Sequence, residues 1–535
     1  MPLLSLPDAA AREGPTLRIA EIVAALSLAA DLGTGQPMGS SLRACALAVR
    51  FGEALALAEE ELGDVYHLAL LRLAGCTADS HLAAAALGDE IAFSARASAL
   101  DYGDPAVMMR FALGFAGAGL APLPRGRAAA AALRFLMRDF GELAAGHCEV
   151  AQAIAGRLGM GKSIQEGLGQ VFERWDGKGL PARLRGEAIT RPVRIVQLAG
   201  DLEAAERVVG ADGAAAVARQ RAGGAFDPEL ARRFAAEAPQ IFSALDQVAT
   251  WDAVLALEPR PHPVLSGEAL DLGPQVIADF VDLKSPFMAG HSRGVAELAA
   301  AAAAAYGLTT AETAVLRRAG YIHDLGRVGV SSGIWGKPGP LTDGEWERVR
   351  LHPYHTERVL SRSIPLSRLG AVASLHRERL DGSGYHRGLP GALLPPPARL
   401  LAAADAYRAM TELRPHRPAL APEEAAETLR GEVRAGRLDG EAGEAVLGAA
   451  GHRGRRSRPE RIAGLTEREL DVLGLLARGL TKRQVAKRLV VSVATVDHHA
   501  RHIYSKIGVS TRAGAALFAM RHDLVGDVTD SSHGA

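Results

Sequence analysis

The sequence predicts an all-α protein: two related helical bundles followed by a small helical domain at the C-terminal end. Apolar residues recur at intervals of three and four positions along most of the 535-residue chain, a spacing typical of amphipathic helices, and alternating β-branched runs are scarce. Sequence landmarks occur twice at matching separations, which indicates a duplication. A chain of this length is expected to form several hydrophobic cores rather than one.

Two connectors divide the chain into three parts. Residues 257–267, LEPRPHPVLSG, are rich in proline, and residues 451–464, GHRGRRSRPERIAG, are polar, basic and contain glycine. Both compositions are typical of linkers. We therefore expect a first domain over 16–250, a second over 268–450, a basic linker over 451–463 and a C-terminal domain over 464–525.

The first two domains repeat one another. The segment ERWDGKGLP at 173–181 matches ERLDGSGYH at 378–386. Three landmarks keep the same separations in both copies: His147, Glu173 and Arg194 in the first, and His352, Glu378 and Arg399 in the second. Equal separations across three landmarks are hard to obtain by chance. We infer a tandem duplication, with extra residues in the first copy between Asp79 and His147.

Imidazole and carboxylate groups interrupt the apolar helical pattern of the second copy. They are His291, His323, Asp324, His352, His376 and Asp405. Each group alone is costly to bury, whereas a divalent metal ion would satisfy all of them together. A mixture of nitrogen and oxygen ligands suits first-row ions such as iron or manganese. A bridging Asp324 could join two ions, a pair that is suited to in-line attack on a phosphodiester.

The second copy resembles the HD-GYP branch of the HD-domain metal-dependent phosphohydrolases over about residues 284–420. The motifs that carry the resemblance are GHSRGVAELA, AGYIHDLGRVGV, GKPGPLTDGEWERVRLHP, HRERLDGSGYHRGLPG and ARLLAAADAYRAMTELRPHR. The resemblance implies tandem HD-domain-like bundles, a metal centre and cyclic di-GMP as the substrate.

The resemblance also implies residue roles. The first metal set would be His291, His323, Asp324 and Asp405, and the second would be His352 and His376, with Asp324 shared. His323 and Asp324 would be the catalytic doublet. The substrate would contact Arg327, Tyr385, Arg414 and Arg417.

Four residues depart from the family pattern. Arg377 stands where the second metal site usually has a histidine, and Arg327 replaces a lysine. His386 replaces the last proline of the GYP signature, and Phe287 replaces a carboxylate. A guanidinium cannot ligate a metal ion, so one ion rather than two is an open alternative. Hydrolysis, and nucleotide sensing without hydrolysis, both remain open as hypotheses.

The first copy lacks most of the metal donors. Ser40, Ala78, Val171 and Gly200 stand at the positions of His291, His323, His376 and Asp405, and of the set only Asp79 and His147 remain. Two ligands cannot hold a catalytic metal ion. We therefore expect a degenerate HD-like domain that packs against the second copy.

Capping-box patterns predict several helix starts. Thr342 and Glu345 are expected to begin the helix that carries His352. In the C-terminal domain the pairs are Thr466 with Glu469 and Thr481 with Gln484, and Ser492 can cap a further helix. A short helix, a tight turn and a longer helix with a basic outer face form the helix-turn-helix arrangement.

The C-terminal domain resembles the LuxR-type DNA-binding domains over its full length, through LTERE, TVDHH and IYSKIGVSTR. Residues 451–525 hold more than twice as many Lys and Arg as Asp and Glu, which is typical of a polyanion-binding module. The resemblance implies contacts with DNA from Thr481, Lys482, Thr495, His498, His499, Arg501 and Lys506. Asp497 would repel phosphate, so we expect it to contact a base amino group.

The combined features predict a transcription regulator that binds promoter DNA as a homodimer and senses or hydrolyses a nucleotide such as cyclic di-GMP. One alternative is a metal-dependent phosphodiesterase whose DNA-binding end only localises it, and another is an interaction protein with two inert copies. Three scattered cysteines, and the lack of a signal-peptide pattern or a long apolar run, favour a cytoplasmic protein that does not enter a membrane.

Overall fold

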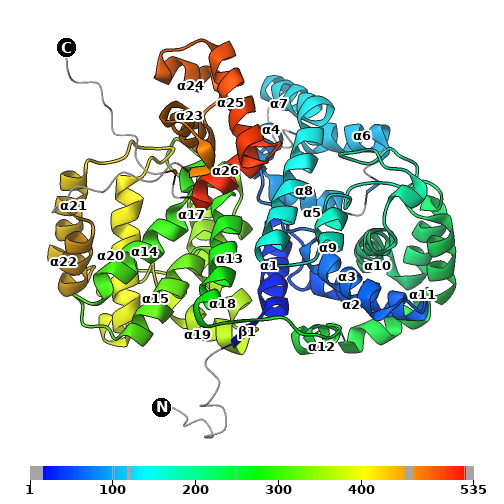
Figure 1. Ribbon diagram of the computed structural model, residues 1–535, viewed down its shortest axis with the longest axis horizontal. Helices are drawn as coiled ribbons and strands as arrows, with labels where there is room; N and C mark the ends of the chain where they lie inside the picture. The colour runs from blue at the N-terminus through cyan, green and yellow to red at the C-terminus, as the bar shows by residue number, and fades with distance from the viewer. Residues whose placement is uncertain are drawn as a thin grey trace, which may run out of the picture.

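Two helical lobes and a small C-terminal domain make up the protein. The computed structural model describes residues 16–98, 100–101, 103–116, 122–248, 250–451, 462–522 and 524–525. Figure 1 shows the lobes side by side, with the C-terminal domain over their junction. In the described part of the chain, β-strands are limited to the pair β1 (Thr16–Arg18) and β2 (Val264–Ser266), apart from three isolated β-bridges. The predicted all-α fold is confirmed.

The first lobe precedes β2 in the chain. Its α-helices are α1 (Ile19–Gly33), α2 (Ser40–Ala54), α3 (Glu59–Leu71), α4 (Ser80–Leu87), α5 (Glu90–Ala97), α6 (Pro105–Phe115), α7 (Pro122–Arg134), α8 (Phe140–Arg157), α9 (Lys162–Leu168), α10 (Arg191–Arg221), α11 (Pro228–Val248) and α12 (Trp251–Ala256). A π-helical turn, η1 (Phe135–Asp139), joins α7 to α8, and η2 (Gly186–Ala188) is a 3-10 turn.

The second lobe follows β2 and the 3-10 turn η3 (Gly267–Asp271). Its α-helices are α13 (Leu272–Asp282), α14 (His291–Ala303), α15 (Thr310–Ile322), α16 (Ser332–Trp335), α17 (Asp343–Arg350), α18 (His352–Leu360), α19 (Ile364–Ala373), α20 (Pro396–Thr411), α21 (Pro422–Arg434) and α22 (Gly440–Ala449). Short 3-10 turns are η4 (Pro286–Met288), η5 (Leu325–Gly329) and η6 (Gly391–Leu393).

The capping box of Thr342 and Glu345 is present, but the expectation for the helix after it is wrong in one respect. The Thr342 hydroxyl accepts from the Glu345 amide and so begins α17. That helix ends at Arg350, and His352 is the first residue of the next helix, α18. Pro353 explains the break, since proline is tolerated in the first turn of a helix but not in its interior.

The two lobes share contacts at equivalent positions. Glu173 accepts backbone hydrogen bonds from Ala182 and Leu184 at 2.7 and 2.8 Å. In the second lobe Glu378 accepts equivalent bonds at 2.8 and 2.9 Å, from the amides of Arg387 and Leu389. Each glutamate thus fixes the loop that begins with the repeated ER-x-DG motif.

A second shared contact involves buried aspartates. Asp31 accepts hydrogen bonds from the amide and hydroxyl of Ser41, and Asp282 does so from Ser292. Burial raises the pKa of both carboxyls to about 7. These pairs fix the start of α2 and of α14, the helix that carries His291.

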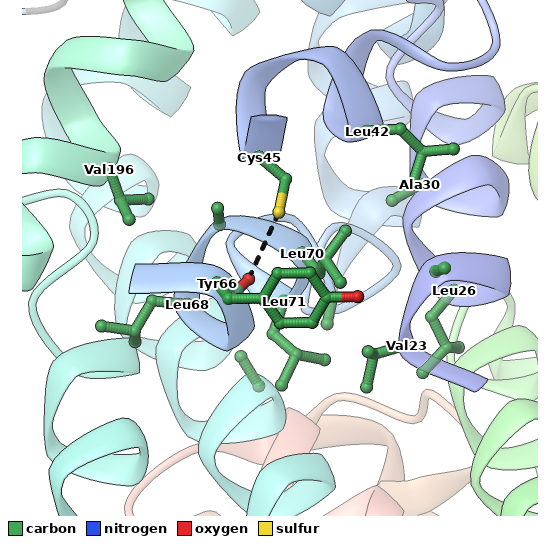
Figure 2. Close-up of a cluster of buried hydrophobic side chains, with 14 of the residues drawn as sticks. Val23, Leu26, Ala30, Leu42, Cys45, Tyr66, Leu68, Leu70, Leu71 and Val196 are labelled. Carbon is green, nitrogen blue, oxygen red and sulfur yellow. Dashed lines mark hydrogen bonds between the residues drawn. The ribbon is translucent and has the colours of Figure 1, made fainter. Parts of the chain in front are cut away.

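One hydrophobic core runs through both lobes. Side chains of α1 belong to the same cluster of buried residues as those of α13 and η5, and β1 pairs antiparallel with β2. Figure 2 shows the first-lobe part of this core, where Val23 and Leu26 of α1 pack near Tyr66 and Leu70 of α3. The Cys45 thiol donates to the Tyr66 carbonyl at 3.6 Å. The lobes are therefore joined by packing and not only by the connector.

The C-terminal domain contains a short 3-10 turn, η7 (Ile462–Gly464), and the helices α23 (Glu467–Ala477), α24 (Lys482–Leu489), α25 (Val493–Ile507) and α26 (Arg512–Arg521). The predicted caps at Thr466, Thr481 and Ser492 are confirmed. Most of the predicted basic linker, residues 452–461, lies outside the described residues.

Helix α26 holds the C-terminal domain against the lobes. Leu517 and Met520 are buried in the core that the lobes share. At its start, Glu149 of α8 accepts from the Ser510 amide at 2.6 Å and from the Thr511 hydroxyl. None of the helices in the described part of the chain has the length and apolar character that a bilayer crossing requires.

The glutamate contacts can be tested with Glu173→Ala. Loss of two hydrogen bonds to a carboxylate should lower the free energy of unfolding by about 2–4 kcal/mol, measured by urea denaturation. Hydrogen exchange at the Ala182 and Leu184 amides should become faster. Glu187→Ala, at an exposed position of the same loop, is the control and should change neither quantity.

Candidate metal centre and nucleic-acid interface

Six donors predicted from the sequence converge in the second lobe. They are His291 at the start of α14, His323 and Asp324 after α15, His352 at the start of α18, His376 after α19 and Asp405 in α20. Each is at most 1% exposed. Five of them form two triads, His291–His323–Asp324 and Asp324–His352–His376, and within each triad the ligand atoms lie within 4.8 Å of one another. The sixth, Asp405, places Oδ1 3.3 Å from His291 Nε2 and 3.9 Å from His323 Nε2.

Asp324 stands between the two triads. Its Oδ2 lies 3.4 Å from His323 Nε2 and 3.8 Å from His291 Nε2. Its Oδ1 lies 3.4 Å from Nε2 of both His352 and His376. Each carboxylate oxygen therefore faces a different pair of imidazoles, the arrangement expected of a bridging ligand.

The histidines are oriented by backbone carbonyls. Nδ1 of His323, His352 and His376 lies 2.7, 2.6 and 2.8 Å from the carbonyls of Gly320, Val349 and Ala373. In a neutral imidazole the nitrogen that faces a carbonyl carries the proton, so each Nε2 presents a lone pair to the cluster. The Nε2 atoms of His352 and His376 are 3.2 Å apart, so these two nitrogens need either a shared proton or a nearby positive charge.

Several buried atoms of the cluster have no hydrogen-bond partner within the described chain. They are Nε2 of His291 and His323, Oδ1 of Asp324 and both carboxylate oxygens of Asp405. Buried polar atoms are almost always satisfied, and a group of acceptors without donors is satisfied by a cation. The donor set fits a divalent metal ion.

The protonation states of four of the donors also fit a metal centre. Burial alone would raise the pKa values of Asp324 and Asp405, but neighbouring Arg327 and Arg377 respectively hold them well below the usual range. Burial lowers the pKa of His376 to about 3 and also lowers that of His352. At neutral pH the carboxylates are therefore ionised and these imidazoles are neutral, which are the forms that bind metal ions.

Glu412 orients His291 and was missed in the sequence. Its Oε2 lies 2.7 Å from His291 Nδ1. Although burial opposes the change, Glu412 and Asp405 raise the pKa of His291 to about 9. Without a metal ion His291 is therefore protonated at neutral pH, and an ion bound at Nε2 would displace that proton. The available signal was a carboxylate two helical turns after Asp405, directly after the end of α20.

Two arginines border the cluster. Arg377 places Nη2 3.4 Å from Oδ2 of Asp405. Arg327 donates to Oδ2 of Asp324 at 2.8 Å, and its guanidinium lies 3.9 Å from the centre of the Trp335 ring. Both guanidiniums are fixed by contacts within the lobe, and Arg377 neutralises one of the carboxylates that the metal set requires.

The other predicted substrate residues occupy different surroundings. The Tyr385 ring centre lies 6.0 Å from that of His352, so Tyr385 borders the cluster. Arg414 donates to Glu412 at 2.9 Å and to the Phe287 carbonyl at 3.1 Å. Arg417 donates to the Ala409 and Met410 carbonyls at the end of α20. The guanidinium donors of Arg414 and Arg417 are thus engaged within the lobe.

The first lobe has filled its equivalent of the metal site. A Cβ atom on Gly200, the counterpart of Asp405, would lie 2.0 Å from the Arg72 guanidinium, so Arg72 occupies that space. His147 places Nε2 2.7 Å from the Arg72 carbonyl, which makes this nitrogen a proton donor rather than a ligand. Burial lowers the pKa of His147 to about 4. The retained His147 therefore has a structural role, as a hydrogen-bond donor to the Arg72 carbonyl, and not a metal-binding one.

The candidate DNA-binding surface lies on α24 and α25. Lys482, His498, Arg501 and Lys506 are exposed, and Thr495 and His499 are half-buried. Thr481 caps α24 and exchanges hydrogen bonds with Gln484. Lys506 donates to Glu469 at 2.7 Å, so this lysine also links α25 to α23.

Asp497 has two partners within the domain. Its Oδ1 accepts from Lys482 at 2.5 Å, and its Oδ2 accepts from Arg501 at 2.8 Å. These bonds lower the pKa of the Asp497 carboxyl. From the sequence we expected Asp497 to contact a base. To do so, Asp497 would have to give up its bonds to Lys482 and Arg501, which lie on the same surface.

Two family models match the chain. The model described as HD domain matches residues 98–230 and 275–442, and the model described as bacterial regulatory proteins, luxR family, matches residues 463–519. The chain belongs to the HD-domain family. Because one model matches both lobes, the tandem duplication is confirmed. The C-terminal domain is a LuxR-type DNA-binding domain.

Similar proteins include one from Vibrio cholerae and one from Thermotoga maritima. The 3′3′-cGAMP-specific phosphodiesterase 3 of Vibrio cholerae is 30% identical over 409 residues, which cover 76% of this chain and 89% of that protein. The cyclic di-GMP phosphodiesterase of Thermotoga maritima is 37% identical over 129 residues, 24% of this chain and 35% of that protein.

A solved structure is also similar. The crystal structure of a cyclic GMP-AMP-specific phosphodiesterase of Vibrio cholerae, V-cGAP3, is 26% identical and has a TM-score of 0.56. The match covers 82% of this chain and 99% of that one. The likeness therefore includes both lobes and not only the lobe with the donor cluster.

The role of Asp497 can be tested with Asp497→Asn. Loss of the carboxylate removes a charge that repels phosphate and releases Lys482 and Arg501. Affinity for duplex DNA should therefore rise by about three- to tenfold and depend more steeply on salt. Fluorescence anisotropy over a salt series measures both, with the half-exposed Asp471→Asn of α23 as the control. A weaker complex would favour contact between Asp497 and a base.

Proposed function

We propose that the chain is a DNA-binding transcription regulator whose second lobe binds a 3′,3′-cyclic dinucleotide at a metal centre. The observation that carries the proposal is the cluster of six buried metal donors, four of which have atoms without a hydrogen-bond partner in the described chain, together with a LuxR-type domain. The names of the relatives support a cyclic dinucleotide, cyclic di-GMP or 3′3′-cGAMP, as the ligand.

The metal centre is proposed to hold one ion, iron or manganese, rather than two. His291, His323, Asp324 and Asp405 are the ligands of that ion. Arg377 stands where the second site usually has a histidine, and a guanidinium cannot ligate a metal ion. Its positive charge also acts on His352 of the second triad, which disfavours another cation there. A bound ion would supply Lewis acidity toward a phosphoryl oxygen of the nucleotide.

The residues around the ion have separate proposed roles. Arg327, held over Trp335, keeps Asp324 ionised and oriented. Tyr385 borders the cluster at the loop fixed by Glu378 and would contact the nucleotide. Arg414 and Arg417 each use both terminal nitrogens in hydrogen bonds within the lobe, whereas Arg327 donates to Asp324 through Nη1. We therefore assign the first contacts with the ligand to Arg327 and Tyr385.

The domain boundaries remain proposals: a degenerate first domain over 16–250, the metal-binding domain over 268–450, a linker over 451–463 and the DNA-binding domain over 464–525. We also propose a cytoplasmic homodimer, because helix-turn-helix proteins bind paired half-sites as dimers. The DNA contacts are assigned to Lys482, Thr495, His498 and Arg501, with Thr481, His499 and Lys506 at the edge of the surface.

Hydrolysis of the nucleotide is the second candidate function. It is favoured by the relatives, which are phosphodiesterases, and by the intact doublet of His323 and Asp324. In this alternative His323 and Asp324 are catalytic, and the DNA-binding end localises an enzyme. The impaired second triad favours binding without turnover.

The number of ions can be tested with Arg377→His. The wild-type chain should contain about one manganese or iron per chain, and the variant about two, because an imidazole adds a ligand and removes a positive charge. Elemental analysis after loading and desalting measures the content. Arg362→His, at an exposed position of the same lobe, should not change it. Equal content in wild type and Arg377→His would contradict the single-ion proposal.

The ligand can be tested by titrating the manganese-loaded chain with cyclic di-GMP and with 3′3′-cGAMP. Calorimetry should detect binding of at least one of them, and chromatography should detect no linear product. Asp324→Ala should lose both metal and nucleotide, while Asp343→Ala, an exposed aspartate at the start of α17, should retain them. Turnover that Asp324→Ala abolishes would favour the enzyme.

A further inference from the structure

The first lobe retains one acidic residue of the metal set, and that residue has acquired a new environment. Asp79 corresponds to Asp324 but has a left-handed backbone, with φ 51° instead of −95°. Positive φ is uncommon for residues other than glycine. The former metal position is filled by Arg72, whereas the Asp79 side chain lines a groove beside α4 and α8.

The groove is built from the segment that distinguishes the first copy from the second. Its volume is about 310 Å³, and its walls come from α4, α7, η1 and α8. Leu82 and Phe135 provide apolar wall, while Asp79, Asp139 and Glu142 provide carboxylates and Arg134 a single guanidinium. The π-helical turn η1 contributes Phe135 and Asp139; such turns are rare and are frequently found at functional sites.

Among the three carboxylates of the groove, Asp79 is unusual because only 7% of the residue is exposed to solvent. Within the described chain its carboxylate has no hydrogen bond and no ion pair within 4.0 Å. The positive charge that lowers its pKa is Arg512 of α26, whose Nη2 donates instead to the carbonyls of Leu476 and Leu480. Burial raises the pKa of Asp79 to about 6. The carboxylate oxygens are not among the fully enclosed unpartnered atoms of the described residues, so this carboxylate faces the groove, where a ligand can donate to it.

We propose that this groove binds a small organic cation, whose ammonium or amidinium group donates to Asp79 and whose apolar part packs against Leu82 and Phe135. Three carboxylates against one guanidinium repel phosphate, so a nucleotide is disfavoured here. The volume lies at the lower limit of ligand pockets, which also favours a compact molecule. The site is separate from the metal centre and does not depend on the function proposed for the second lobe.

The position of the groove connects it to the DNA-binding domain. Asp79 and Arg512 also line a second, smaller cavity, together with His81 of the first lobe and Asp282 of the second. The proposed ligand would therefore bind a carboxylate that also attracts Arg512 of α26, where the first lobe meets the C-terminal domain.

Benzylammonium is a suitable probe for the full-length chain, with neutral benzyl alcohol as its matched comparison. Calorimetry or ligand-observed NMR should give saturable binding of benzylammonium, with the alcohol at least about tenfold weaker, since a tenfold ratio is about 1.4 kcal/mol. Asp79→Asn should weaken benzylammonium by about tenfold or more and leave the alcohol unchanged. Asp212→Asn, at an exposed position outside the groove, should bind as the wild type does.

A second variant separates loss of the site from loss of folding. Ala85 lines the groove and is exposed, so Ala85→Trp should fill it, abolish binding of benzylammonium and leave the melting temperature unchanged. Asp79→Asn should melt no lower than the wild type, because it removes an unpaired buried charge. The proposal is overturned if benzylammonium binds no better than benzyl alcohol, or if either groove variant binds it as tightly as the wild type does.

Discussion

The structure of the second lobe depends on a buried carboxylate that faces four imidazoles. Asp324 is fully buried, and its two oxygens meet two separate pairs of histidines. Because backbone carbonyls hold the Nδ1 protons of three of these histidines, the cluster consists of acceptors. Such a cluster is stable only with positive charge close to it. In the protein alone, Arg327 and Arg377 supply that charge from the edge, and a metal ion would supply it at the centre.

The duplication shows which contacts the fold requires and which belong to the metal site. Both lobes keep the glutamate that fixes a loop, and both keep the buried aspartate that fixes a helix start. Only the second lobe keeps all six donors, whereas the first keeps Asp79 and His147. In the first lobe the Arg72 guanidinium fills the space left by the loss of a carboxylate at Gly200. In the first lobe a cationic side chain therefore occupies this space instead of a metal ion, and the lobe remains packed.

The DNA-binding domain contacts the lobes close to the donor cluster. Gly479, in the turn between α23 and α24, lies directly against Pro286 of η4. The adjacent Phe287 carbonyl accepts from Arg414, which also donates to Glu412, the partner of His291. A short series of contacts therefore joins a metal-ligand candidate to the helix-turn-helix turn, and α26 is fixed separately by Glu149.

The sequence by itself determined the helical class, the duplication, the helix caps at Thr342, Thr466 and Thr481, and the membership of the donor cluster. The helical class and the caps depend on periodicity and on residues three positions apart, which are local. The duplication depends on equal separations between landmarks, and the donor cluster on residue types together with the resemblance to a known family. The tertiary structure decided which nitrogen of each histidine faces the cluster, that Glu412 orients His291, and that Arg414 and Arg417 have partners within the lobe. It also decided that Arg72 fills the former metal site and that Asp79 lines a groove instead. Each of these outcomes depends on packing between segments far apart in the chain, for which the sequence carries no periodic signal.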